Sequence, residues 1–236
     1  MNLLIFILGT IFGSFLGLVV DRRIKGESIV SPRSHCEACG KTLTALDLVP
    51  IFSFTFSKGR CRHCGTRLSL FYPLVEIIAG ALLVLNFKLT SSILEFILLS
   101  AASFLALLIA LIDLRTMEYF SYQVYILLGL GLLYRAIFLG FDKVYGRFFL
   151  IFSLVYLILY LGFKDSLGDG DYYYYLGLSL FLRSSSLLYF ILISIWLGAI
   201  GGIFKAIRHK TTKLRMAFCP YIFLSFIILQ IYGVIL

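Results

Sequence analysis

Long apolar runs dominate the sequence, and they constrain the fold more than any other feature. An α-helix needs about 17–25 residues to cross a bilayer, and most of these runs approach that length. Eight runs can be counted, at residues 3–20, 71–87, 93–112, 120–139, 148–163, 172–182, 187–204 and 216–236. The run at 172–182 is short, so it must be extended, tilted or only partly inserted. The pattern predicts an all-α polytopic membrane protein with about eight transmembrane helices.

Composition agrees with a membrane protein. The chain has 236 residues, is 61% hydrophobic and has a mean hydropathy of +0.99, whereas soluble domains are about half apolar. In so apolar a chain, the net charge of +9 favours basic cytosolic loops over nucleic-acid binding. No basic segment precedes the first run, so we expect a first span there rather than a cleaved signal peptide.

Loop charges predict the orientation. If the segment after the first run is cytosolic, roughly sixteen of the 21 Lys and Arg residues lie on the cytosolic side, as the positive-inside rule favours. Eight spans then leave both termini outside. The same parity brings the end of the third run and the end of the loop after the fifth run to the cytosolic face.

A polar segment at residues 22–70 contains two CxxC pairs. Cys36 and Cys39 form the first pair, and Cys61 and Cys64 form the second. Four thiolates at this spacing suit a tetrahedral zinc ion, and the reducing cytosol disfavours structural disulfides. Four cysteines leave no open coordination position, so we predict a structural zinc that folds a small domain.

Two aspartates mark the predicted site of chemistry. Asp113 closes the third apolar run, and Asp171 ends the sequence Gly168-Asp169-Gly170-Asp171. Ionisable residues at a membrane boundary are costly unless they are solvated or paired. Two carboxylates that share a proton can act as the acid and the base of peptide hydrolysis. We predict that Asp113 and Asp171 form such a pair, with Asp169 as the competitor of Asp171. The alternative is that they are solvated loop acids that never meet.

Two other features receive structural interpretations. Cys219 stands alone in an apolar run, and we interpret it as a small packed residue rather than a nucleophile. The tyrosines at 172–175 are interpreted as an interfacial aromatic belt.

Taken together, these motifs resemble the type IV prepilin peptidases, which are GxGD-type membrane aspartic proteases. Residues 168–171 fit the GxGD pattern, and Asp113 fits the other catalytic aspartate. Further segments follow in the family's order over nearly the whole chain, at residues 13–16, 34–39, 47–50, 59–64 and 72–76. The chain also departs from the family pattern. The usual Pro-Phe-Gly-Pro is replaced by Ala217-Phe218-Cys219-Pro220, the usual Asn by Gly17, and a common Lys by Tyr173.

The resemblance implies a concrete activity. Such enzymes cut a short basic leader from type IV prepilins or pseudopilins at the cytosolic face of the bacterial inner membrane, after a glycine. Many members with the cysteine loop then methylate the new N-terminal residue with S-adenosylmethionine. Glu76 and Gly80 match the family's Tyr-Pro-x-Val-Glu-x3-Gly pattern and are candidates for methyl transfer, although Glu76 has the alternative of a structural polar contact. The implied domains are a first helix at 1–21, a zinc-binding domain at 22–70 and a protease domain of about seven helices at 71–236.

Two other functions stay open. A transporter with membrane-boundary acids is one, but transporter sites lie near the midplane in repeated, broken helices, and the sequence has no internal repeat. A non-enzymatic scaffold whose zinc module recruits partners is the other. Such a scaffold would tolerate the loss of Asp113 and Asp171 but not the loss of the cysteines.

Overall fold

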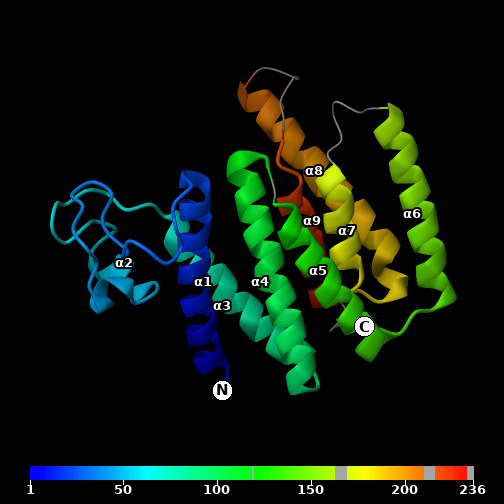
Figure 1. Ribbon diagram of the computed structural model, residues 1–236, viewed down its shortest axis with the longest axis horizontal. Coiled ribbons are helices and arrows are strands. Elements are labelled where there is room, and N and C mark those ends of the chain that lie inside the picture. The colour runs from blue at the N-terminus through cyan, green and yellow to red at the C-terminus, as the bar shows by residue number, and fades with distance from the viewer. Residues whose placement is uncertain (119, 163–168, 210–215, 233–236) are drawn as a thin grey trace. The chain divides into compact units, whose positions relative to one another are not determined.

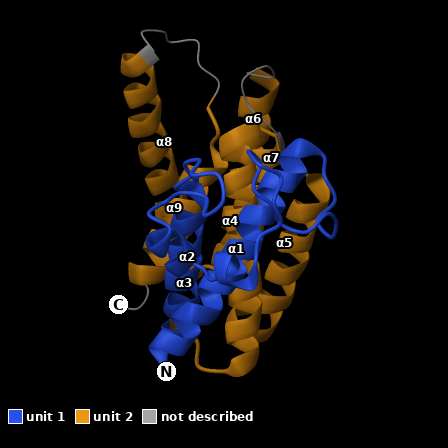
Figure 2. Cartoon of the chain, turned by 90° about the vertical axis from the view of Figure 1, so that its left-hand side faces the viewer, with its two compact units in different colours: residues 1–88 blue, residues 89–236 orange. Residues whose placement is uncertain are grey.

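The computed structural model describes residues 1–118, 120–162, 169–209 and 216–232 (Figure 1). Within these residues the regular structure is helical, with two isolated β-bridges and no β-strand. The all-α class predicted from the apolar runs is therefore confirmed. The chain divides into two compact units, residues 1–88 and 89–236, coloured separately in Figure 2. The division places the second long helix with the first helix and the cysteine loop, whereas the resemblance implied a boundary at residue 70.

The first unit is built on two long helices, α1 (Asn2–Lys25) and α3 (Phe71–Leu89), with the short η1 (Ala45–Leu48) and α2 (Phe52–Phe56) between them. Glycines four residues apart let the backbones of α1 and α3 approach closely. A Cβ on Gly9 would lie 2.7 Å from the Gly80 Cα, and one on Gly13 would lie 2.7 Å from the Glu76 Cα. These contacts leave no room for larger side chains, so α1 and α3 form one tightly packed pair.

A buried arginine shapes the exit from α1. The helix ends at Gly26, whose left-handed conformation (φ 70°) is a common helix terminator. The Arg22 guanidinium turns back over the following loop and donates hydrogen bonds to the carbonyl oxygens of Ser28 (2.7 Å) and Ile29 (3.0 Å). The first residues of the cysteine loop are thereby held against the helix end.

The second unit contains the remaining helices. They are α4 (Ile93–Thr116), α5 (Ser121–Tyr134), η2 (Arg135–Leu139), α6 (Lys143–Gly162), α7 (Asp169–Ser179), η3 (Ser184–Ser186), α8 (Leu187–His209) and α9 (Cys219–Tyr232). Helix α5 packs on α4 and α7, and α9 packs on α4, α7 and α8. Leu127 of α5 and Leu178 of α7 are fully buried in this core. The short α7 thus lies among longer helices.

Local sequence explains where α4 begins and ends. Ser92 precedes the helix, and its hydroxyl accepts a hydrogen bond from the Glu95 N–H at 3.2 Å, which satisfies one of the free donors at the helix start. The helix ends at Met117, which adopts the left-handed conformation with φ 56°. Asp113 is consequently placed in the last turn of a long apolar helix.

Among the residues that the structure describes, six helices are long and apolar enough to cross a membrane: α1, α3, α4, α5 with η2, α6, and α8 with η3. The other two predicted spans form shorter helices in the described part of the chain. Helix α7 has 11 residues and α9 has 14, and residues 233–236 lie outside the described range. Eight complete spans therefore remain a prediction.

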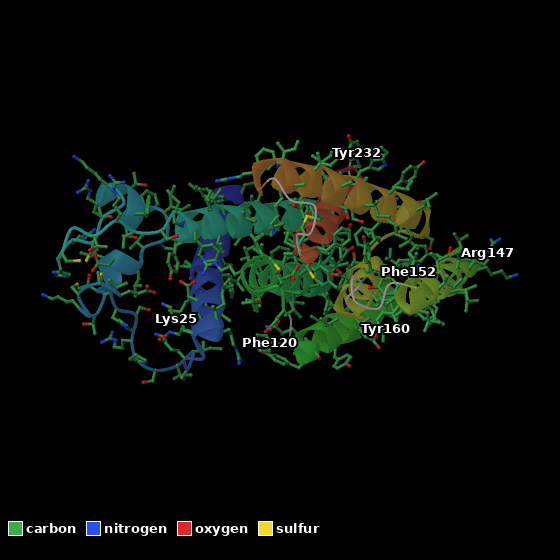
Figure 3. All side chains as sticks on the ribbon, turned by 90° about the horizontal axis from the view of Figure 1, so that it is seen from above. Lys25, Phe120, Arg147, Phe152, Tyr160 and Tyr232 are labelled. Atoms are coloured by element: carbon green, nitrogen blue, oxygen red, sulfur yellow. The ribbon has the colours of Figure 1, made fainter. Side chains whose placement is uncertain are left out.

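The interpretation of residues 172–175 as an aromatic belt is wrong for two of the four tyrosines. Tyr174 is fully buried and Tyr175 is 6% exposed. The Tyr174 hydroxyl donates to the Ala106 carbonyl oxygen at 2.9 Å, and the Tyr175 hydroxyl hydrogen-bonds with Ser194. Tyr172 packs in parallel on Phe152 of α6, with ring centroids 5.9 Å apart; Phe152 is labelled in Figure 3. These rings hold α7 against its neighbours.

Candidate active site

The four loop cysteines come together as the spacing predicts. Their sulfur atoms all lie within 4.8 Å of one another, and the Cys36 and Cys64 Sγ atoms are 3.9 Å apart. The sulfur atoms appear as a yellow cluster at the left of Figure 3. A tetrahedral zinc ion with Zn–S bonds of about 2.3 Å requires sulfurs roughly 3.8 Å apart. The donor set and its spacing therefore fit a structural zinc ion.

Two equivalent turns present the cysteines. In the first turn the Cys36 N–H donates to the Lys41 carbonyl oxygen at 2.9 Å, and the Gly40 N–H donates to the Cys36 carbonyl oxygen at 2.8 Å. In the second turn Cys61, Thr66 and Gly65 repeat the same two bonds at 2.8 and 3.0 Å. The glycine of each turn has a positive φ, which favours glycine. The glycine after each CxxC pair is explained by this geometry.

The environment of the cluster favours thiolates at two positions. The Thr66 hydroxyl and backbone lower the pKa of Cys64 to about 6. Backbone N–H groups of Cys39 and Ala38 lower the pKa of Cys36. Metal binding requires deprotonated thiols, so the turns prepare part of the ligand set for a cation.

The two predicted aspartates meet at a third residue, Cys219. Asp113 lies in the last turn of α4 and is 9% exposed, and its Oδ2 accepts a hydrogen bond from the Cys219 N–H at 2.9 Å. Asp171 lies in the first turn of α7, and its Oδ1 is 3.6 Å from the Cys219 Sγ, which donates to it. The sequence separation between Asp113 and Cys219 is 106 residues. Three helix ends therefore converge on one small polar site inside the second unit.

The first turn of α9 explains why the Asp113 carboxylate lies beside Cys219. The first N–H groups of a helix have no partner within the helix, and they attract negative charge. Cys219 is the first residue of α9, and Pro220 follows it. Proline has no N–H to donate and suits an early helix position. The Cys219 N–H is thus the donor that Asp113 satisfies.

Tyr174 fixes the position of α7 along the axis of α4. It lies three residues after Asp171, on the same face of the helix, and its hydroxyl donates to Ala106 of α4. Its neighbours include Asp113, Asp171 and Cys219. A fully buried phenol with one hydrogen bond to a fixed carbonyl limits sliding of α7, so it helps hold Asp171 near Cys219.

The other acids near the pair are placed as follows. Gly168 and Asp165 lie outside the described residues, as does the side chain of Asp169, whose backbone begins α7. Glu118 is exposed after the end of α4. A catalytic role of Asp169 therefore stays an alternative prediction. Asp171, in contrast, contacts Cys219, the residue that also binds Asp113.

The candidates for methyl transfer lie in the first unit. Glu76 is 6% exposed, and its Oε2 accepts a hydrogen bond from the Ile51 N–H at 2.7 Å. This contact is the structural role that we raised as the alternative for Glu76. A Cβ on Gly80 would lie 2.7 Å from the Phe6 Cε2. Close packing of α1 on α3 accounts for this glycine, and a role of either residue in methyl transfer stays a prediction.

Two family models match the chain in succession. The model described as the bacterial peptidase A24 N-terminal domain matches residues 7–89, and the model of the type IV leader peptidase family matches residues 99–203. The first match nearly coincides with the first compact unit, and the second includes both Asp113 and Asp171. The chain belongs to the type IV leader peptidase family. The resemblance read from the motifs is thereby confirmed.

Named relatives in this family agree. A prepilin leader peptidase/N-methyltransferase of Aeromonas salmonicida (strain A449) is 29% identical over 266 residues, which cover 98% of this chain and 90% of the relative. A protein of the same name from Bacillus subtilis (strain 168) is 44% identical over 79 residues, or 34% of this chain and 32% of the relative. A Myxococcus xanthus (strain DK1622) relative is 44% identical over 78 residues, or 33% of this chain and 23% of the relative. The matched segments thus span about a third or less of the Bacillus and Myxococcus proteins. No solved structure matches the chain significantly.

Sequence reasoning missed the position of Cys219. The apolar run around it suggested packing, and it is indeed 3% exposed. The signal that could have identified it was its place in the family pattern, because residues 217–220 correspond to the family's late motif and depart from it at Ala217 and Cys219.

Proposed function

We propose that this protein is a membrane aspartic endopeptidase that removes the short basic leader of type IV prepilins or pseudopilins, cutting after a glycine at the cytosolic face. The observation that carries the proposal is the convergence of Asp113 and Asp171 on Cys219 at 2.9 and 3.6 Å. Membership of the type IV leader peptidase family supports the same reaction. The substrate class follows from the names of the relatives.

The pair of carboxyl groups supplies an acid and a base. Like charges held close disfavour double ionisation, so the pair shares one proton. The ionised carboxylate takes a proton from water while the water oxygen bonds to the scissile carbonyl carbon. The protonated carboxyl protonates the carbonyl oxygen. Collapse of this intermediate breaks the C–N bond: the proton held by the first carboxylate passes to the leaving amine, and a hydroxyl of the intermediate returns a proton to the second carboxylate.

The relatives are named N-methyltransferases as well as leader peptidases, which supports a second reaction. We propose that the chain transfers a methyl group from S-adenosylmethionine to the new N-terminal amine, with Glu76 and Gly80 as candidate residues. When bound, S-adenosylmethionine would supply an electrophilic methyl group. The buried Glu76 carboxylate accepts a hydrogen bond from the Ile51 N–H at 2.7 Å, so it is suited to orient the backbone of the cysteine loop between the two CxxC pairs. The zinc ion is proposed to be structural in both reactions.

Co-expression with a prepilin tests the proposal. The substrate carries a basic leader that ends in glycine followed by phenylalanine, and intact-mass spectrometry reads cleavage and methylation together. We expect Asp113→Asn and Asp171→Asn each to lower cleavage by at least about a thousandfold, because loss of a member of a catalytic unit has effects of this order. Glu95→Gln is the matched control, since Glu95 is an acid in the first turn of α4, at the other end of the helix from Asp113.

Each contrary result has a distinct meaning. Cleavage that survives both aspartate changes would contradict the two-acid assignment, and Asp169→Asn would be measured next. A wild-type protein that cuts no such substrate, while binding partners through an intact cysteine loop, would favour the scaffold alternative. Solute uptake that depends on the two acids would favour the transporter.

A further inference from the structure

One residue contacts both carboxylates of the proposed active site. The Cys219 backbone N–H donates to Asp113 Oδ2 at 2.9 Å, and its thiol donates to Asp171 Oδ1 at 3.6 Å. The residue is 3% exposed. Its two donors therefore lie between acids that belong to α4 and α7.

The two contacts differ in what they require of the residue. Any residue except proline would supply the N–H that holds Asp113. Only a side chain with a donor at the γ position reaches Asp171 as the thiol does. The thiol is therefore the part of this residue that acts on Asp171.

We propose that Cys219 is a positioning residue of the two-aspartate site, whose thiol orients Asp171 and favours its ionised form while its N–H holds Asp113. The inference rests on the proposed peptidase function. A hydrogen bond to a charged carboxylate favours that charged form over the protonated one, and S–H is a weak donor. The expected effect is therefore a modest shift of the pH profile rather than a loss of catalysis.

The other titratable groups around the thiol are few among the described residues. They are Asp113 from α4 and Asp171, Tyr174 and Tyr175 from α7. Both tyrosine hydroxyls are committed elsewhere, Tyr174 to Ala106 and Tyr175 to Ser194. The two acids are consequently the groups whose titration the thiol changes.

Steady-state cleavage by the purified full-length protein, measured against pH, tests the proposal. Cys219→Ala and Cys219→Gly remove the thiol donor, and Cys219→Ser keeps a donor of similar size. We expect the acidic limb of kcat to move to higher pH by roughly half a unit in the Ala and Gly variants, with KM unchanged, and to return toward the wild-type position in the Ser variant. Identical limbs in the wild type and the Ala variant would overturn the proposal.

Ser225→Ala is the matched control. Ser225 is a fully buried hydroxyl residue of the same helix, and it donates to the Ile222 carbonyl oxygen at 2.8 Å, so its loss disturbs α9 without touching the acids. A shift of the same size in this control would show that packing, and not the thiol donor, sets the profile.

Infrared spectroscopy tests the thiol contact without any substrate. When zinc holds the four loop cysteines as thiolates, Cys219 carries the last S–H group, because the chain has five cysteines. We expect its S–H stretching band to lie below the frequency of a free thiol and to rise in Asp171→Ala. A band that Asp171→Ala leaves unchanged would refute the contact even if the protein proved to have no peptidase activity, and inactivity of the wild type with a shifted band would refute only the proposed function.

Discussion

Arg135 is the largest fully buried side chain in the second unit, at 1% exposure. Its guanidinium donates to the Leu182 carbonyl oxygen at 3.0 Å and to the Ser184 hydroxyl at 2.9 Å, and it lies 3.5 Å from the centroid of the Tyr145 ring. These contacts join η2 to α6 and to the segment between α7 and α8. A planar cation with several donors is needed to make them all at once.

We therefore predict that Arg135→Lys destabilises the protein by about 3 kcal/mol, because a lysine leaves buried acceptors unpaired and loses the stacking on Tyr145. The measurement is unfolding in detergent, followed by circular dichroism. Arg147→Lys is the control, since Arg147 is exposed on α6 and projects away from the helices in Figure 3. Equal stability of the two variants would contradict the bridging role of Arg135.

At the scale of elements, the cysteine loop is a small unit with little apolar core of its own. None of the residues of η1 or α2 is buried, and large side chains such as Phe52 and Phe56 are exposed. Two paired turns and the cluster of four sulfurs are the main organising contacts. We propose that the predicted zinc ion supplies most of the folding free energy of this loop, as it does in small metal-binding domains.

Removal of one ligand should therefore unfold the loop. We predict that Cys61→Ser lowers bound zinc from one ion per chain to a small fraction and makes residues 26–70 sensitive to protease, while α1 and α3 stay intact. Elemental analysis and limited proteolysis with mass spectrometry provide the two measurements. His63→Ala, an exposed neighbour of the second pair, should keep its zinc, and loss of zinc in this control would mean that the ligand set is not the four cysteines.

At the scale of the whole molecule, the proposed reaction requires the acids to face the compartment that holds prepilin leaders. The basic residues after the first helix predict that this loop is cytosolic. Helix α4, which ends beside Asp113, would then also end in the cytosol, and the Gly140–Asp142 turn after η2 would lie outside. The orientation is a proposal that reporter fusions can test.

We predict that green fluorescent protein fused after Thr116 is fluorescent and that alkaline phosphatase fused there is inactive. Fusions after Asp142 should give the opposite result, because each reporter works on one side of the membrane only. The reversed pattern at both positions would contradict the cytosolic location of the acids. The same pattern at both positions would contradict the assignment of α5 with η2 as a span.

Much of the candidate site was predictable because its chemistry is encoded locally. Cys36, Cys39, Cys61 and Cys64 cluster as their spacing predicts, and the two aspartates predicted as a pair share a partner. The contacts of Cys219 and Arg135 were not predictable, because each joins residues far apart in sequence through the packing of helix ends. The burial of Tyr174 was not predictable for the same reason. In the sequence, a tyrosine next to an apolar run looks the same whether it faces the membrane interface or packs against other helices.

The sequence by itself determined that this chain is a helical membrane protein with a loop of four cysteines that could hold a metal ion. Apolar runs in lipid must satisfy their own backbone hydrogen bonds, and two CxxC pairs present four soft ligands, so neither conclusion depends on the tertiary arrangement. Only the tertiary structure decided that the start of α9 lies between Asp113 and Asp171. The N–H groups at a helix start attract whichever carboxylate packing brings within reach, and packing is a property of the assembled helices.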